Sequence, residues 1–241
     1  MNKSNFFKGL CIAAAMFAAC FSVHAQKHET SFYFNGFLPV GEFNSRYDLN
    51  PVEFRPMDRY SVAQYAGAGI GLSYRFGFWF DIGYGQLQPY AEASFFWNPT
   101  KKSVTDIYDD NDMNDQLGFT PVTPHYFNVP AMLGLKYRYS VTTTVQPFAE
   151  FALGFDAMFI SRNGYGENNL LWYCYKPSFN FAWMVGAGTY LGDKVSVGLY
   201  YFGLGDHRIN YNRFCEVSDP TSSKVVKRNI GELAIRFGFH F

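Results

Sequence analysis

The chain has 241 residues, and 20 Lys and Arg balance 20 Asp and Glu, so its formal net charge is zero. This balance gives no reason to expect nucleic acid as a partner, because phosphate-binding proteins carry a basic surplus. Aromatic residues make up 20% of the chain. No run of about eighteen apolar residues occurs, so no membrane-spanning helix is predicted.

The chain begins with a pattern typical of a secretory signal peptide. Lys3 and Lys8 provide a positive start, Leu10–Phe21 is apolar, and Val23–Ala25 matches a small-x-Ala cleavage site. We therefore predict cleavage after Ala25. A lipoprotein signal around Cys20 is the alternative, although Phe17 stands where such a signal usually has an aliphatic residue.

Cleavage divides the chain into a removed segment, 1–25, and one mature domain, 26–241. The removed segment contains Lys3 and Lys8 and no acidic residue, so the mature chain keeps 18 basic against 20 acidic residues. The mature net charge is therefore slightly negative, and nucleic acid remains excluded as an expected partner.

Eight stretches of the mature chain alternate between apolar residues and small or polar residues. A period of two is typical of β-strands. In the last stretch, GELAIRFGFHF, every second residue from Leu233 to Phe241 is apolar. The eight stretches lie at 31–38, 66–75, 90–97, 129–139, 149–159, 179–188, 195–201 and 231–241.

The second face of these strands distinguishes two kinds of β protein. In a soluble sandwich it would meet water and be rich in Lys, Thr and Glu. Here it holds mostly glycine and small residues with isolated charges, which suits the narrow inside of a small barrel. The stretches approach the roughly nine to eleven residues that a strand needs to cross a bilayer. We therefore predict an eight-stranded antiparallel up-and-down transmembrane β-barrel with its apolar face toward lipid.

The connections between the predicted strands alternate in length. Those at 140–144 and 192–194 are short, and FGFWFDIGYG at 76–85 is expected to extend both flanking strands. Long polar segments lie at 39–64, 98–125, 162–177 and 205–230. Outer-membrane barrels have short periplasmic turns and long external loops. Both termini are therefore expected on the periplasmic side.

Four segments carry a resemblance to a known family: FYFNGFLPVGEFN (32–44), FNVPAMLGLKYRY (127–139), QPFAEFALGF (146–155) and RFGFHF (236–241). With the signal peptide, they resemble the small outer-membrane β-barrel family of Bacteroidota-type bacteria, similar in architecture to OmpA/OmpX-type barrels. The resemblance spans essentially the whole mature chain. It implies a Gram-negative outer membrane, with lipid and lipopolysaccharide around the barrel, and no single activity. It also implies that Phe239 and Phe241 form the signal read by the barrel assembly machinery.

Charged residues on the predicted inner face suggest what fills the lumen. An eight-stranded barrel leaves room for little more than its own side chains, and charges buried there must pair. We therefore expect an ion-pair network that closes the lumen, with an ion-conducting lumen as the alternative. The residues concerned are Arg75, Glu92, Lys136, Arg138, Glu150, Asp156 and Arg236.

Two predicted external loops carry opposite charges. Asp110, Asp112 and Asn114 match the first three ligand positions of a calcium loop. Asp115 then stands where the turn needs Gly, and Pro121 replaces the bidentate Glu, so a solvated acidic loop is favoured over a weak calcium site. The segment 205–230 is rich in Lys and Arg instead, and could hold acidic lipopolysaccharide or another glycan.

Two of the four cysteines stay in the mature chain. Cys11 and Cys20 leave with the signal peptide, whereas Cys174 and Cys215 lie in the third and fourth predicted external loops. In an oxidising exterior, two cysteines can form one bridge. We hypothesise a disulfide between these two loops, with two unpaired thiols as the alternative.

Motifs for catalysis are missing from the mature sequence. It has no G-x-S-x-G elbow, and a lipase-like site would need Ser, His and a carboxylate at one depth. His125 and His207 are placed at strand ends or loops, and His240 near the periplasmic rim. We predict a non-enzymatic barrel without a cofactor, with a structural role or with external loops that meet surface ligands. A narrow porin-like channel is the first alternative and an outer-membrane lipid-modifying enzyme the second.

Overall fold

The computed structural model describes residues 27–44, 65–102, 121–139, 144–165, 171–215 and 223–241. The predicted signal peptide lies outside these residues, and so do the candidate calcium ligands Asp110, Asp112 and Asn114.

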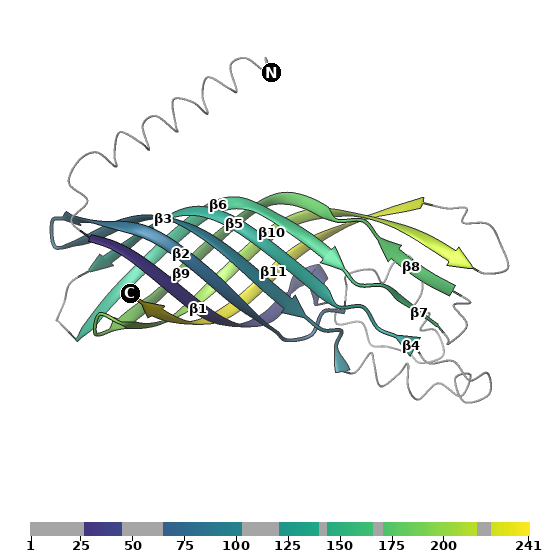
Figure 1. Cartoon of the computed structure of the whole chain (residues 1–241), viewed down its shortest axis with the longest axis horizontal. Helices are drawn as coiled ribbons and strands as arrows, with labels where there is room; N and C mark the ends of the chain where they lie inside the picture. The colour runs from purple at the N-terminus through teal and green to yellow at the C-terminus, as the bar shows by residue number, and fades with distance from the viewer. Residues whose placement is uncertain (1–26, 45–64, 103–120, 140–143, 166–170, 216–222) are drawn as a thin grey trace, which may run out of the picture.

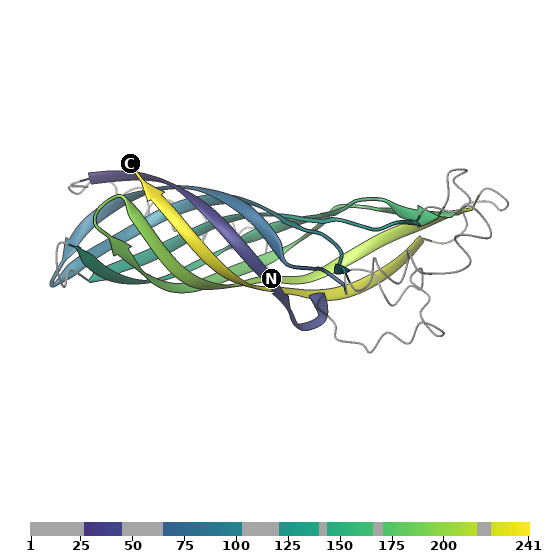
Figure 2. The same ribbon diagram turned by 90° about the horizontal axis from the view of Figure 1, so that it is seen from below.

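Within the described residues, eight long strands form a closed antiparallel barrel, which confirms the predicted fold (Figures 1 and 2). Their order around the barrel is β11-β1-β2-β3-β5-β6-β9-β10, and β10 also pairs with β11. The strands are β1 (Lys27–Val40), β2 (Gly69–Ile82), β3 (Gly85–Asn98), β5 (Tyr126–Tyr139), β6 (Val145–Ile160), β9 (Ser178–Leu191), β10 (Val195–Cys215) and β11 (Ser223–His240).

Burial alternates along each strand as the sequence pattern requires. In β1, Phe32 and Phe34 are 50% and 54% exposed, whereas Ser31 and Tyr33 between them are buried. Large apolar side chains point outward on all eight strands, while polar and charged ones are enclosed. The apolar face is therefore the outer face of the barrel, and the core lies in its lumen.

The last strand closes the barrel against the first. β11 pairs with β1 from Ser31↔His240 to Val40↔Gly231. Beyond the strand, Phe241 and Thr30 exchange two backbone hydrogen bonds of 3.2 and 2.9 Å. Closure leaves neither strand with an unpaired edge along this seam.

One end of the barrel, the turn end, carries short connections. A two-residue turn, Gly83–Tyr84, joins β2 to β3, so the predicted extension of both strands through 76–85 is confirmed. Gly83 in this turn and Gly192 in the turn between β9 and β10 adopt φ values of 58° and 70°, a region that favours glycine. The C-terminal residue and the start of β1 lie at this same end (Figure 1).

The opposite end, the loop end, departs from the prediction of a long polar loop at 205–230. There β10 and β11 stay paired as far as Asn212↔Ser223, after a bulge at Gly203–Gly205. Three short strands, β8 (Leu171–Tyr175), β7 (Asn163–Tyr165) and β4 (Pro121–Val122), continue the sheet from β10. The barrel wall therefore extends beyond the barrel as a curved sheet (Figure 1).

A one-turn 3-10 helix, η1 (Gly41–Phe43), follows β1 at the loop end and packs against β11. No helix in the described part of the chain is long and apolar enough to cross a membrane.

Candidate functional site in the barrel lumen

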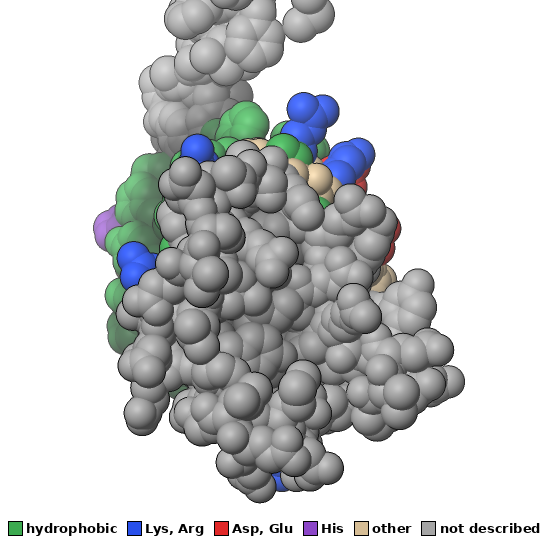
Figure 3. All heavy atoms as spheres, turned by 90° about the vertical axis from the view of Figure 1, so that its right-hand side faces the viewer, with side chains coloured by type: hydrophobic (Ala, Val, Ile, Leu, Met, Phe, Trp, Pro, Cys, Tyr) green, Lys and Arg blue, Asp and Glu red, His purple; other side chains and the backbone are tan. Residues whose placement is uncertain are grey.

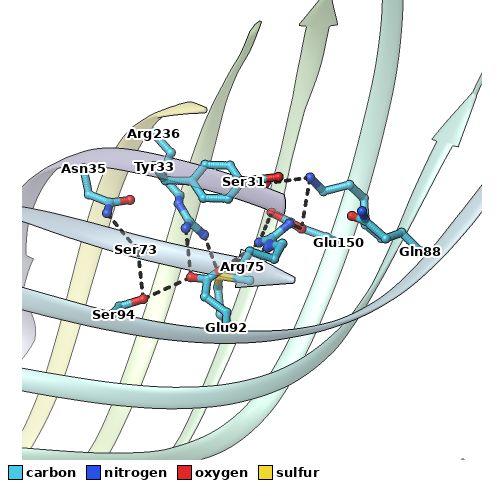
Figure 4. A network of polar contacts seen from close by, with 12 residues as sticks. Ser31, Tyr33, Asn35, Ser73, Arg75, Gln88, Glu92, Ser94, Glu150 and Arg236 are labelled. Carbon is cyan, nitrogen blue, oxygen red and sulfur yellow. Dashed lines mark hydrogen bonds and ion pairs between the residues drawn. The ribbon is translucent and has the colours of Figure 1, made fainter. Parts of the chain in front are cut away.

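An ion-pair network crosses the middle of the lumen (Figure 4). We call its five charged members, Arg75, Glu92, Lys136, Glu150 and Arg236, the ionic layer. Arg75 Nη1 lies 2.5 Å from Glu150 Oε2, and Arg75 Nη2 lies 2.7 Å from Glu92 Oε2. Arg236 Nη2 lies 2.8 Å from the other oxygen of Glu92. All five side chains are buried.

Strand register builds this layer. Arg75 on β2 stands directly opposite Glu92 on β3, and Lys136 on β5 stands opposite Glu150 on β6. Inward-pointing residues on neighbouring strands therefore meet as cross-strand pairs of opposite charge. Arg75 links the two pairs across the lumen through its bond to Glu150.

Aromatic side chains surround the cations of the ionic layer. Lys136 Nζ donates to the hydroxyls of Tyr33 and Tyr190, at 3.1 Å each. The Arg75 guanidinium lies 3.7 Å from the ring centre of Tyr90, and the Arg236 guanidinium lies 4.2 Å from that of Tyr33. Ring faces attract desolvated cations, so these tyrosines both fill space and stabilise charge.

A second polar group lies nearer the turn end. Glu29 accepts hydrogen bonds from Trp79 Nε1 at 2.9 Å and Gln88 Nε2 at 3.1 Å. His240 Nδ1 lies 3.2 Å from Glu29, and His240 Nε2 lies 2.8 Å from Ser196 Oγ. This is the order of a serine–histidine–carboxylate relay. Ser196 and His240 are only 2% and 4% exposed, so these groups are shielded from solvent.

A third polar group lies nearer the loop end. Asp156 Oδ2 lies 3.1 Å from His207 Nε2, and both side chains are fully buried. Glu232 is buried on the same inner face, and neither of its oxygens accepts a hydrogen bond from the described residues. The structure therefore places His207 inside a barrel strand, not at a strand end or in a loop as we expected.

Apolar side chains close the remaining sections of the lumen. The rings of Phe37, Phe96 and Phe202 pack together with centre-to-centre distances of 4.2, 5.0 and 5.9 Å. At the loop end, η1 inserts Phe43, which is fully buried and lies 5.5 Å from the ring of Tyr126. Apolar and ionic sections thus alternate along the lumen axis.

The seven predicted lumen charges all lie on the inner face, but they do not form one network. Five make the ionic layer. Asp156 belongs to the loop-end group with His207. Arg138 lies toward the turn end, where it donates to Gln86 and its guanidinium lies 4.2 Å from the ring of Trp79. The expectation of a single seven-residue network is therefore corrected, because the residues occupy three different depths.

Sequence reasoning did not single out several polar residues of the lumen, among them Glu29, Tyr33 and Gln88. Glu29 stands only four residues after the predicted cleavage site, before the alternating pattern begins. Tyr33 and Gln88 lie on the inner face at positions that we did not single out, although strand alternation marks both as inward. Glu29 and Gln88 could have been found by continuing the alternation of β1 and β3 toward the turn end, because both strands begin before the marked stretches.

The hypothesis of a disulfide between Cys174 and Cys215 is not supported by this structure. Cys174 is a free, half-buried thiol. In the β8–β10 ladder it stands opposite Asn212, three residues from Cys215. Three residues of strand separate the two Cα atoms by about 10 Å, whereas a disulfide allows about 7 Å at most.

The two phenylalanines of the expected assembly signal lie at the seam between β1 and β11. Phe239 points outward, and its ring lies 6.1 Å from that of Phe34. Phe241 is 75% exposed, with its ring 6.4 Å from that of Phe32. Both rings are thus available on the outer face.

The sequence matches no model of a known protein family and no curated protein. It is 14% identical to a major outer membrane protein from Thermus thermophilus, with a TM-score of 0.46 over 88% of this chain and 99% of that one. It is 12% identical to the outer membrane protein OprG from Pseudomonas aeruginosa, with a TM-score of 0.42 over 89% of this chain and 95% of that one. It is 9% identical to Ail, the attachment invasion locus protein of Yersinia pestis, with a TM-score of 0.41 over 90% of this chain and 100% of that one. At these identities the likeness concerns the barrel fold alone.

Proposed function

We propose that this protein is an integral outer-membrane barrel with a closed lumen, and that it acts through its external surface. The supporting observation is that the barrel exposes apolar side chains on its outer surface and buries charged ones in its lumen, the reverse of a water-soluble protein. Phe155, Leu199 and Ile70 are 67%, 67% and 61% exposed on the outside, while Arg75 and Arg236 are enclosed. A water-soluble protein rarely exposes so continuous an apolar surface, whereas a bilayer would cover it.

The orientation follows from the two ends of the barrel. The short turns and the described chain ends would face the periplasm, and the extended sheet of β10, β11, β8, β7 and β4 would stand outside the cell. The proposed role, structural or interactive, therefore rests on this sheet and the long connections near it. Neither role requires a path through the lumen.

The closed lumen separates this proposal from a narrow channel. Because Arg75, Lys136 and Phe202 are fully buried inside the barrel, we expect no steady single-channel current from the purified protein in a planar bilayer. A purified general porin, which has a water-filled lumen, is the positive control in the same bilayer.

The porin should conduct steadily, which would show that the assay detects an open lumen. Large, steady currents from the native protein would overturn the closed lumen and favour the channel. A change in the mass of lipid A after expression would instead favour the enzyme.

A further inference from the structure

We propose that the lumen holds one Ca²⁺ ion near its loop end, between two buried carboxylates and two asparagine side chains. We call these four residues, Asn98, Asn128, Asp156 and Glu232, the acidic layer. The inference goes beyond the proposed surface role and does not depend on it, because it concerns the interior of the barrel alone.

Strand register brings three members of the acidic layer together. Asn128 on β5 stands opposite Phe96 on β3 and Met158 on β6. Asn98 and Asp156 are the next inward residues on those two strands. Both are therefore diagonal neighbours of Asn128 on the inner face, one on each side of it.

Glu232 joins this layer from β11, which stands across the barrel from β5. The Asn98 side chain lies over Gly69 of β2, where an added Cβ would be 2.5 Å from Asn98 Nδ2. Asn98 is near enough to Glu232 to interact with it, and Asp156 is near enough to repel it. The four side chains therefore face one common space in the lumen.

The two carboxylates of this layer are short of positive charge. Within the described residues, no oxygen of Asp156 or Glu232 accepts a hydrogen bond, and only His207 lies at ion-pair distance, 3.1 Å from Asp156. His207 Nε2 donates instead to the backbone oxygen of Leu204, at 2.9 Å. Even a charged His207 would balance one carboxylate and leave the other uncompensated.

Lysine and arginine side chains lie elsewhere in the described part of the chain. Those that are buried, Arg75, Lys136 and Arg236, all belong to the ionic layer. On β3 the ring of Phe96 separates Asn98 from the ionic layer. The Lys and Arg side chains that can be seen from the loop end lie around the outside of the molecule (Figure 3).

Burial makes this shortage of positive charge costly. All four side chains of the acidic layer are fully buried. On the loop-end side, the buried rings of Phe43 and Tyr126 pack together above them. A carboxylate without a partner is strongly unfavourable in such a site, and one divalent cation between Asp156 and Glu232 would compensate both.

Unused amide oxygens identify the kind of cation. In the described chain, Asn128 has no hydrogen-bond partner at either side-chain atom, and Asn98 Oδ1 has none. No group of three or more His, Cys, Asp or Glu side chains there is arranged to hold a metal ion, so the two amides must complete the site. Carboxylate and amide oxygens suit Ca²⁺, which accepts irregular coordination more readily than Mg²⁺ does.

The test counts the Ca²⁺ bound to the full chain after refolding with Ca²⁺ in zwitterionic detergent and removal of free ion. We expect one tightly held ion per native chain. Glu232→Gln removes a charge with little change in volume and should weaken Ca²⁺ binding by about tenfold or more. Asp112→Asn is the matched control, because its segment is the other calcium candidate of the sequence, and it should keep the ion.

Urea unfolding in the same detergent provides a second measurement. Ca²⁺ should raise the urea midpoint of the native chain, since it binds the folded state, and should leave that of Glu232→Gln unchanged. In a chelator the order should reverse. Glu232→Gln should then be at least as stable as the native chain, because it lacks one uncompensated carboxylate.

Asn128→Leu is a second variant, of similar size, that keeps both carboxylates and removes one amide oxygen. It should also weaken Ca²⁺ binding, and heat-modifiable gel migration shows that each variant is folded. A native chain without bound Ca²⁺ would overturn the proposal. An equal rise of the urea midpoint in the native chain and in Glu232→Gln would also overturn it, since the ion would then bind elsewhere.

Discussion

Replacing Arg75 with alanine is expected to lower the free energy of unfolding of the barrel by about 3–5 kcal/mol, the usual cost of leaving a buried charge without its partner. Arg75 bonds both Glu92 and Glu150, and all three side chains are enclosed. Its loss leaves Glu150 with only Lys136, 3.8 Å away. Urea unfolding of the refolded protein in detergent micelles or lipid vesicles, followed by tryptophan fluorescence, measures the change.

Two further variants show whether charge is the cause. Arg162→Ala changes an exposed arginine, so its effect should stay within about 0.5 kcal/mol. Arg75→Met keeps most of the side-chain volume but not the charge, so it should destabilise the barrel nearly as much as Arg75→Ala does. An Arg75→Met variant close to native stability would mean that packing, and not the lost charge, determines the loss.

Deleting Phe241 is expected to reduce the amount of barrel assembled in the outer membrane severalfold, while the purified, refolded variant stays close to native stability. The ring is 75% exposed, and the deletion removes two backbone hydrogen bonds with Thr30, each contributing about 1 kcal/mol. An effect on assembly larger than this small loss would identify Phe241 as part of a recognition signal. Quantitative immunoblots of outer-membrane fractions provide the measurement.

Phe179→Ala is the matched control for this deletion, because Phe179 is 73% exposed on the outer face of β9. It should assemble normally. Normal assembly without Phe241 would contradict the assembly signal and leave the barrel itself untouched.

The strand pattern made the fold predictable from the sequence. Alternation in the last strand implied that every second residue from Leu233 to Phe241 faces outward and that Arg236 faces inward. The strand has that arrangement along its seam with β1. Alternation works here because the two faces of a barrel strand meet different environments, the outside of the barrel and its packed lumen. It also identified Arg75 and Glu92 as inward residues before their pairing was known.

The depth of each inward residue could not be predicted in the same way. Asp156 and Glu150 share one face of one strand, yet Glu150 meets Arg75 and Asp156 meets His207. Depth depends on the register between strands, which a single strand does not reveal. Periodicity therefore identified the charges of the lumen but not their partners.

The extended hairpin of β10 and β11 was missed for a different reason. Arg208 and Lys227 stand opposite each other beyond the apolar part of the barrel, and both are exposed. In the proposed orientation this hairpin lies outside the bilayer and needs no apolar outer face, so its sequence is as polar as a loop. The signal that remained was the inward alternation of His207 and Ile209.

The most direct test of a closed barrel in the outer membrane is the gel migration of the native full chain from fractionated cells. The protein should sediment with the outer membrane, and its unheated band should migrate differently from its boiled band, because an intact barrel resists unfolding in detergent. A protein found in the soluble fraction, with the same migration before and after boiling, would contradict the barrel, its apolar outer face and its proposed location together.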